Sequence, residues 1–311
     1  MKKLYIIGNG FDLYHGLPSS YYSFRDYVKI HDPELFDRIE MYLYPTSYSP
    51  EANLDLWKNF EESLGNLDDD KLRDFARNYL VEYGDDDWSE DYNFTYQRSL
   101  SEITDSLNIQ LRDLLRSWIQ DVDKVLPNKN RIPLDKDAKY LSFNYTHTLE
   151  NLYELSKDIL HIHGLVSDEN SQLTLGHCQE PKPRRTEEDI KNSMSAESYE
   201  EYKEERAGDD PRIYEGEDII GEYWENSYKN TSKIISENQF FFDDLKDIEE
   251  IHVIGLSFSP IDLGYLHEVC RQTPNAKWYV SFHTLKEKEE FREVLINILG
   301  VKENNIQLFH L

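Results

Sequence analysis

Four short segments that carry polar side chains lie at points where an apolar run, expected to be a strand, ends. These segments read GNGFD at 8–12, FNYT at 143–146, IHG at 162–164 and GLSFSPID at 255–262. In open parallel α/β sheets, ligands bind just beyond the carboxyl ends of the strands. We therefore expect these segments to meet at one edge of a sheet and to form one binding or catalytic site.

The first segment is typical of a turn that brings the backbone close to a phosphate. Gly8 and Gly10 permit a tight turn on either side of Asn9, and we expect the backbone N–H groups of all three to cradle a pyrophosphate. The third glycine of the full dinucleotide-binding spacing is absent, and a strand-to-helix turn without a ligand explains these residues equally well. Asp12 is placed to contact a ribose or a backbone N–H, or to stabilise the turn locally.

Asn144 and His163 are the candidates for catalytic side chains. Asn144 ends a strand expected over 139–143, where its amide either caps the next helix or orients a ribose hydroxyl or a water. His163 ends a strand expected over 159–163 and can act as a general base near neutral pH, although a lone histidine is more often structural. Metal binding is the competing interpretation of His15 and of the four histidines in 147–177, but no metal-ligand spacing is present.

The last segment repeats the pattern of a strand, a glycine turn and a helix start. Gly255 and Ser257 end a strand expected over 250–258, and Asp262 lies in the first turn of the helix that follows. This arrangement suits an anion or a ribose, although a carboxylate near a helix start is favourable with the helix dipole alone. The spacings of a serine nucleophile elbow and of a P-loop are both absent.

The elements that would position these residues alternate between strands and helices. Apolar runs predict strands, and helical spacing of apolar residues fills most of the intervals between them. The predicted strands are 3–7, 139–143, 159–163, 173–175, 250–258, 277–283 and 305–311. The alternation predicts a Rossmann-like α/β fold whose largely parallel sheet is covered on both faces.

We expect residues 1–311 to form a single domain that carries two additional segments. Residues 30–130 have mostly helical patterns and are expected to be a helical insertion in the α/β core. Residues 180–222 form an acidic insert, in which 197–222 carries eleven acids against three bases. Such a block is usually a solvated helix face or a mobile insert. Residues 85–91, with five acids and no base, are expected to be a loop.

The net charge limits the kinds of partner that the chain can bind. Lys and Arg total 34 and Asp and Glu total 61, which gives a net charge of −27. That balance argues against extended nucleic-acid binding and against adsorption to an anionic membrane. Much of the acid lies in 85–91 and 197–222, away from the glycine turns. A small phosphate site lined by backbone N–H groups therefore remains compatible with the charge.

Cysteine content and hydropathy favour a cytoplasmic protein. The two cysteines, Cys178 and Cys270, provide neither a disulfide framework nor a Cys-x-x-Cys pair for zinc. No segment approaches the ~20 apolar residues of a membrane span. The apolar run at the N-terminus stops at Gly8, which is too short for the core of a signal peptide.

The same motifs resemble two groups of bacterial defence proteins. The opening IIGNGFDLYHGLPSSYYSF is similar to the signature of the AbiH family of phage abortive-infection proteins. WKNFEESLG, SFNYTHTLENLY, IHG, GH and VIGLSFSPIDLGYL extend this resemblance along the chain. In the same order, the motifs also resemble sirtuin-like domains: a glycine-rich turn with Gly-Leu-Pro, an Asn-Tyr element, a His-Gly and a G-x-S-type strand end.

The second resemblance implies a sirtuin-like NAD-binding core in which Asn144 and His163 carry cleavage of the glycosidic bond of NAD⁺. The chain departs from that pattern in two places. Thr146 stands where the pattern has an aspartate, and Asn9 and Asp12 replace small residues near the first turn. The cysteine module that binds zinc in protein-deacylating sirtuins is absent, which argues against a peptide deacylase.

The sequence thus predicts an anti-phage effector that binds NAD⁺ or a related nucleotide and hydrolyses the nicotinamide–ribose bond without a metal. Asn144 would orient the water or a ribose hydroxyl, and His163 would act as the base or contact the ribose. The residues expected to bind the nucleotide are Gly8, Asn9, Gly10, Asp12, Gly255, Ser257 and Asp262. A phage-derived activator protein is a further expected partner, and self-association is left open.

Two other functions fit the sequence. The first is a non-catalytic nucleotide sensor or toxin module that acts through protein–protein contacts. The second is an acidic decoy that engages a nucleic-acid-binding phage protein through residues 197–222. The sensor predicts nucleotide binding without product, and the decoy predicts that the acidic block is required while Asn144 is not.

Overall fold

The computed structural model describes most of the 311 residues. The described ranges are 2–44, 56–85, 88–127, 131–167, 173–182, 187–206 and 210–311. Within these ranges, no helix combines the length and the hydrophobicity that a membrane span requires.

A single sheet of six parallel strands forms the centre of the fold. The strand order is β3-β2-β1-β4-β5-β6. The strands are β1 (Lys3–Ile7), β2 (Lys139–Ser142), β3 (Ile159–His161), β4 (Glu250–Ile254), β5 (Lys277–Phe282) and β6 (Ile306–His310). The predicted α/β class is therefore confirmed. The strand order reverses between β1 and β4, which is the switch point where doubly wound sheets bind their ligands.

The sequence of β1 explains why it lies at the centre. Strands buried on both faces have nearly continuous apolar runs, and four of the five residues of β1 are buried. Leu4 and Ile6 pack on one face, in a cluster that includes Tyr265 of helix α15. Tyr5 and Ile7 pack on the other face, in a cluster that includes Phe11.

Short helices cover both faces of the sheet. The face of Tyr5 and Ile7 is covered by α1 (Asn9–Tyr14) and α9 (Thr148–Tyr153). The opposite face is covered by α13 (Thr231–Glu237), α14 (Gln239–Asp243), α15 (Leu263–Gln272) and α16 (Leu285–Glu293), which continues as a π-helical turn over Val294–Ile298. A 3₁₀ turn over Glu303–Asn305 leads into β6.

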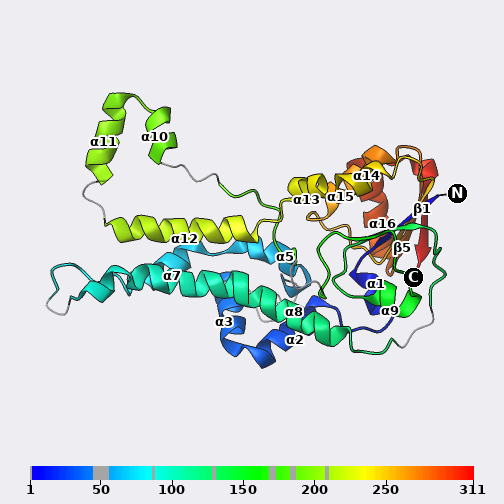
Figure 1. The fold of residues 1–311 in the computed structure, drawn as a ribbon, viewed down its shortest axis with the longest axis horizontal. Coiled ribbons are helices and arrows are strands. Elements are labelled where there is room, and N and C mark those ends of the chain that lie inside the picture. Colours follow the sequence, from blue (N-terminus) through cyan, green and yellow to red (C-terminus); the bar gives the residue numbers. More distant parts are fainter. Residues whose placement is uncertain are drawn as a thin grey trace.

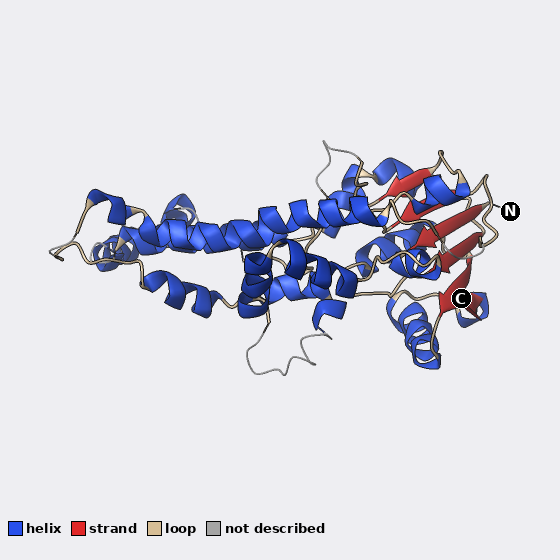
Figure 2. Ribbon diagram, turned by 90° about the horizontal axis from the view of Figure 1, so that it is seen from below, coloured by secondary structure: helices blue, strands red, loops and turns tan. Residues whose placement is uncertain are grey.

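The remaining helices extend away from the sheet (Figures 1 and 2). Between β1 and β2 the structure has α2 (Tyr21–His31), α3 (Pro33–Tyr42), α5 (Phe60–Ser63), α6 (Asp69–Arg77), α7 (Thr95–Asp105) and α8 (Leu111–Val122). Short turns lie at Leu64–Asn66, Glu90–Asn93 and Ser106–Gln110, the last a π turn that joins α7 to α8. Between β3 and β4 lie α10 (Glu187–Ser193), α11 (Ala196–Arg206) and α12 (Pro211–Ser227). We call α2 to α8 together with α12 the helical arm.

The helical arm has a hydrophobic core of its own. Trp57, Phe60 and Leu107 are buried in it, and α12 contributes Ile220 and Tyr223 to the same cluster. Part of the acidic block 197–222 is therefore a packed helix rather than a free insert. The division of the chain into one domain with insertions at 30–130 and 180–222 stays a prediction, and residues 86–87 of the predicted loop lie outside the described residues.

Three predicted strands differ from the structure. The strand expected over 250–258 ends at Ile254, because Gly255 has a φ of +69°, a conformation that strands do not use. The strand expected over 159–163 ends at His161, where a turn begins. Residues 173–175 form no strand. Their leucines are apolar because they are buried in the core of the helical arm.

Candidate active site

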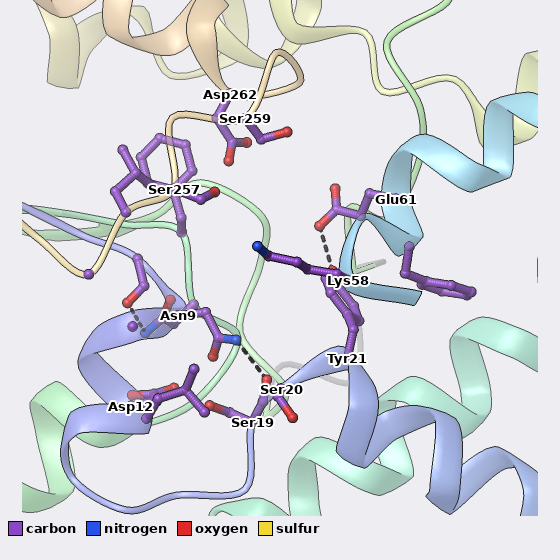
Figure 3. A pocket seen from close by; sticks show the side chains of 18 of the residues that line it. Asn9, Asp12, Ser19, Ser20, Tyr21, Lys58, Glu61, Ser257, Ser259 and Asp262 are labelled. Carbon is purple, nitrogen blue, oxygen red and sulfur yellow. Dashed lines mark hydrogen bonds between the residues drawn. The ribbon is translucent and has the colours of Figure 1, made fainter. Parts of the chain in front are cut away.

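A cavity of about 450 Å³ opens beyond the carboxyl ends of the central strands. It is lined by all nine residues expected to catalyse or bind: Gly8, Asn9, Gly10, Asp12, Asn144, His163, Gly255, Ser257 and Asp262. Figure 3 shows several of them around the opening. The volume lies in the range of small-molecule sites. Four segments that are distant in the sequence thus meet at one place, which is the switch point of the sheet.

The glycines of the first and last segments allow two backbone turns to touch. The N–H of Gly8 donates to Ile254 O at 3.0 Å, and that of Gly10 donates to Gly255 O at 2.8 Å. A Cβ atom on Gly255 would lie 2.2 Å from the backbone nitrogen of Phe11. These two glycine amides are thus already engaged and are not free to cradle a pyrophosphate, as the sequence had led us to expect. Gly8, Gly10 and Gly255 instead allow the turn after β1 to contact the turn after β4, because none of them has a side chain.

Asp12 is a buried carboxylate at the floor of this cavity. Its Oδ2 accepts a hydrogen bond of 2.6 Å from the hydroxyl of Thr146, whereas Oδ1 is buried and has no partner among the described residues. Burial raises the pKa of Asp12 to about 6. The carboxylate of Asp12 in the first segment and the hydroxyl of Thr146 in the second segment are therefore joined by a short hydrogen bond.

Asn144 links the end of β2 to the first turn. Its Nδ2 donates to Gly8 O at 3.2 Å, and its side chain is 7% exposed. The alternative that Asn144 caps the next helix is wrong, because α9 begins at Thr148 and His147 occupies its N-cap position. The amide of Asn144 therefore lies at the cavity wall, beside the β1 turn.

His163 presents an unused acceptor to the cavity. Its Nδ1 lies 3.2 Å from Phe143 O, and because a carbonyl oxygen only accepts, the ring proton is placed on Nδ1. Nε2 is buried, has no hydrogen-bond partner among the described residues and lies 3.7 Å from Asp262 Oδ1. Burial, together with the nearby Lys229 ammonium, holds the pKa of His163 well below its usual range. The imidazole is thus neutral, with a free lone pair on Nε2.

The cavity also contains charged residues that the sequence analysis missed. Glu61 and Lys58 come from the helical arm, and Glu61 accepts a 2.6 Å hydrogen bond from the hydroxyl of Tyr21. Lys229 lies behind the cavity, in contact with Glu61 and Asp262. Glu61 lies within the WKNFEESLG motif, which was an available signal. Lys229 lies in no motif that the sequence analysis singled out.

The remaining histidines of the predicted metal-binding alternative have other partners. His15 contacts Phe11 O and the hydroxyl of Tyr153, and His161 contacts Glu150. Across the described ranges, no three His, Cys, Asp or Glu side chains gather in an arrangement that could hold a metal ion.

Comparison with protein families assigns the chain. The family model for bacteriophage abortive infection AbiH matches residues 4–282. The chain belongs to the AbiH family. The matched region of this AbiH protein runs from Leu4 in β1 to the end of β5 and contains all nine of the predicted site residues. Membership places the protein in phage defence by abortive infection. A search among curated proteins finds no match.

Proposed function

We propose that this AbiH protein acts in abortive infection by binding NAD⁺, or a nucleotide with the same cationic N-ribosyl group, and hydrolysing the bond between the base and the ribose. The observation that carries the proposal is the pair of His163 and Asp262 at the switch point of the sheet. An unprotonated Nε2 faces a carboxylate across 3.7 Å at the wall of a cavity of ligand size.

The reaction requires little from the protein beyond positioning and charge. The oxygen of a water molecule bonds to C1′ of the ribose while the bond from C1′ to the ring nitrogen breaks. The bonding electrons go to the ring nitrogen, so the cationic ring leaves as neutral nicotinamide. The water proton passes to Nε2 of His163, and the products are nicotinamide, ADP-ribose and a proton. Asn144 holds the β1 turn and orients a ribose hydroxyl.

The charge of the cavity supports this substrate class. The ionisable acids that line it are Asp12, Glu61, Glu62, Asp262 and Glu287, and Lys58 is the lining lysine. A positive charge develops on the ribose in the transition state, and fixed carboxylates in a site shielded from water stabilise such a charge. The same carboxylates favour the cationic ring of NAD⁺ over the neutral ring of NADH.

Phage infection of cells that express the protein provides the first test, because infection supplies any activating component. We expect cellular NAD⁺ to fall and nicotinamide to rise after infection with the wild type. The Asn144→Ala, His163→Ala double variant should leave both unchanged. His310→Ala, which removes an exposed histidine on β6, is the matched control and should behave as the wild type.

The second test uses purified protein, with and without an infected-cell extract, incubated with NAD⁺ or with NADH. Release of nicotinamide from NAD⁺ alone supports the proposal. Full turnover by the double variant would refute the roles of Asn144 and His163. Tight binding of NAD⁺ without product, under both conditions, would instead favour a non-catalytic nucleotide sensor.

A further inference from the structure

A lysine with no solvent exposure lies between two carboxylates behind the cavity. Lys229 follows the end of α12, and its side chain is 0% exposed. Its Nζ lies 3.0 Å from Glu61 Oε2 and 3.3 Å from Asp262 Oδ1. Glu61 belongs to α5 of the helical arm, and Asp262 is the N-cap residue of α15 on the sheet. Lys229 therefore bridges the two parts of the molecule at the site.

Fold stability alone is a poor explanation for this arrangement. Removing an ammonium and two carboxylates from water is costly, and apolar residues of similar volume often replace buried ion pairs without loss. The helical arm and the sheet each have an extensive apolar core. A buried charge in a protein with such cores calls for a role beyond packing.

The ion pairs of Lys229 end at the cavity. Glu61 and Asp262 both line it, and so does Tyr21, whose hydroxyl donates to the second oxygen of Glu61. Figure 3 shows Glu61, Tyr21 and Asp262 from three different elements around the same space. Asp262 Oδ1, the atom that contacts Lys229, is also the atom that faces Nε2 of His163. One carboxylate oxygen thus lies beside both the lysine and the histidine.

We propose that Lys229 and Glu61 are positioning residues of the active site, which hold Asp262 in place and keep a positive charge next to His163. The helical arm therefore supplies part of the catalytic machinery and is more than a scaffold. This inference rests on the proposed hydrolysis for its effect on turnover, but its electrostatic part concerns the protein alone.

The groups that face His163 determine what the loss of Lys229 would do. The rings of Phe143, Tyr145 and Tyr265 surround the imidazole. The charged groups are Lys229 and Asp262, with Glu61 on the far side of the lysine. Lys229 lowers the pKa of His163 and also opposes the rise that burial causes in the pKa of Asp262.

The two pKa values would both change when the lysine is removed. Without the ammonium, two buried carboxylates face each other, and a proton taken up by His163 would pair with Asp262. The pKa of His163 should therefore rise. At acidic pH, the protonated imidazole cannot act as a base, so the acidic limb of the activity profile should move to higher pH.

The experiment compares Lys229→Met, Lys229→Arg and Glu61→Gln with the wild type. The control is Lys233→Met, which removes an exposed lysine on α13. The ¹⁵N signals of the histidine rings are recorded from pH 4 to 8 in the full-length protein, and the spectrum of His163→Ala identifies the His163 signals. This titration needs no turnover, so it tests the inference even if NAD⁺ hydrolysis is not found. Nicotinamide release is measured over the same pH range.

Three results would support the inference. Lys229→Met should raise the pH at which His163 protonates and move the acidic limb of the nicotinamide-release profile to higher pH, because the protonated imidazole cannot act as a base. Lys229→Arg should keep the wild-type titration. In Glu61→Gln the amide oxygen can still accept from Lys229, and the NH2 group can donate to the Tyr21 oxygen, so the variant should remain folded while it loses the negative charge and reduces turnover.

Two results would overturn it. The first is a folded Lys229→Met protein with the wild-type titration of His163. The second is Glu61→Gln with the turnover and pH profile of the wild type, and it applies even if Lys229→Met fails to fold. Circular dichroism and the thermal midpoint of unfolding report folding of each variant. No NAD⁺ turnover by the wild type, together with the expected titration shift, would reject the hydrolase and keep the electrostatic role of Lys229.

Discussion

The close contact between the turns after β1 and β4 allows the effect of Gly255→Ala on the free energy of unfolding to be estimated. In Gly255→Ala, the new Cβ would lie 2.2 Å from Phe11 N and 2.4 Å from Gly10 C, so the β1 turn has to move away from the end of β4. The hydrogen bonds of 3.0 Å from Gly8 and 2.8 Å from Gly10 join these same turns. The substitution therefore strains one residue and breaks two hydrogen bonds.

The expected loss of stability follows from these parts. A non-glycine residue in the left-handed region costs about 1–2 kcal/mol. Each lost backbone hydrogen bond adds about 0.5–1.5 kcal/mol. Gly255→Ala should thus lower the free energy of unfolding by about 2–5 kcal/mol. A typical domain has about 5–15 kcal/mol, so the variant should remain folded.

Gly300 provides a matched control for this prediction. Its φ is +71°, close to the +69° of Gly255, but a Cβ there would meet no atom within 4 Å. Gly300→Ala should cost only the backbone term of about 1–2 kcal/mol. The measurement is urea unfolding followed by circular dichroism and tryptophan fluorescence. Equal destabilisation of the two variants would refute the argument that the turns are held by close contact. Gly255→Ala, unlike Gly300→Ala, should also weaken nucleotide binding.

Three further variants test the charges of the site and its surroundings. Burial raises the pKa of Asp12 from 3.8 to about 6, so the stability of the wild type should fall as the pH rises through that window. In urea unfolding, Asp12→Asn should be about 1–3 kcal/mol more stable than the wild type at pH 7.5 and equal to it at pH 4. The hydrogen bond to Asp123 raises the pKa of His147, and this stabilisation is present below pH 6.5 and lost as the pH rises through the raised value. His147→Gln should therefore lose about 1 kcal/mol at pH 6 and less at pH 9. Among the described residues Lys58 makes no ion pair, and it extends into the cavity (Figure 3). Lys58→Ala should therefore weaken nucleotide binding, measured by titration calorimetry, about tenfold at low salt and less at high salt.

Parallel strands made part of the site predictable from the sequence. Apolar runs marked all six strands, and the carboxyl ends of parallel strands necessarily share one edge of the sheet. Gly8, Asn144, His163 and Gly255 could be assigned to one cavity for this reason alone. The finer expectations failed where a local contact decided the outcome. The amides of Gly8 and Gly10 are engaged by the neighbouring turn rather than left free for a ligand.

The charged partners of the site could not be predicted in this way. Lys229 contacts Glu61 across 168 positions of sequence and Asp262 across 33, and no periodic pattern relates them. Their proximity depends on how the helical arm packs against the sheet, which is a tertiary property. Leu173 and Leu175 show the same limit of sequence-based prediction. Their apolar side chains indicate that the segment is buried, but not whether it is a strand or a loop.

The pairing of β1 with β4 also has a consequence for the synthesis of the protein. The turn after β1 needs the turn after β4 as its partner, and about 250 residues separate them along the chain. At a translation rate of about 5–20 residues per second, the synthesis of β4 follows that of β1 after roughly 12–50 s. During this interval the cavity lacks a wall, and the ion pair of Lys229 with Asp262 cannot form. A chain whose translation stops before β4 therefore lacks part of the candidate active site. The site of this AbiH protein can form only after about four fifths of the chain has been synthesised.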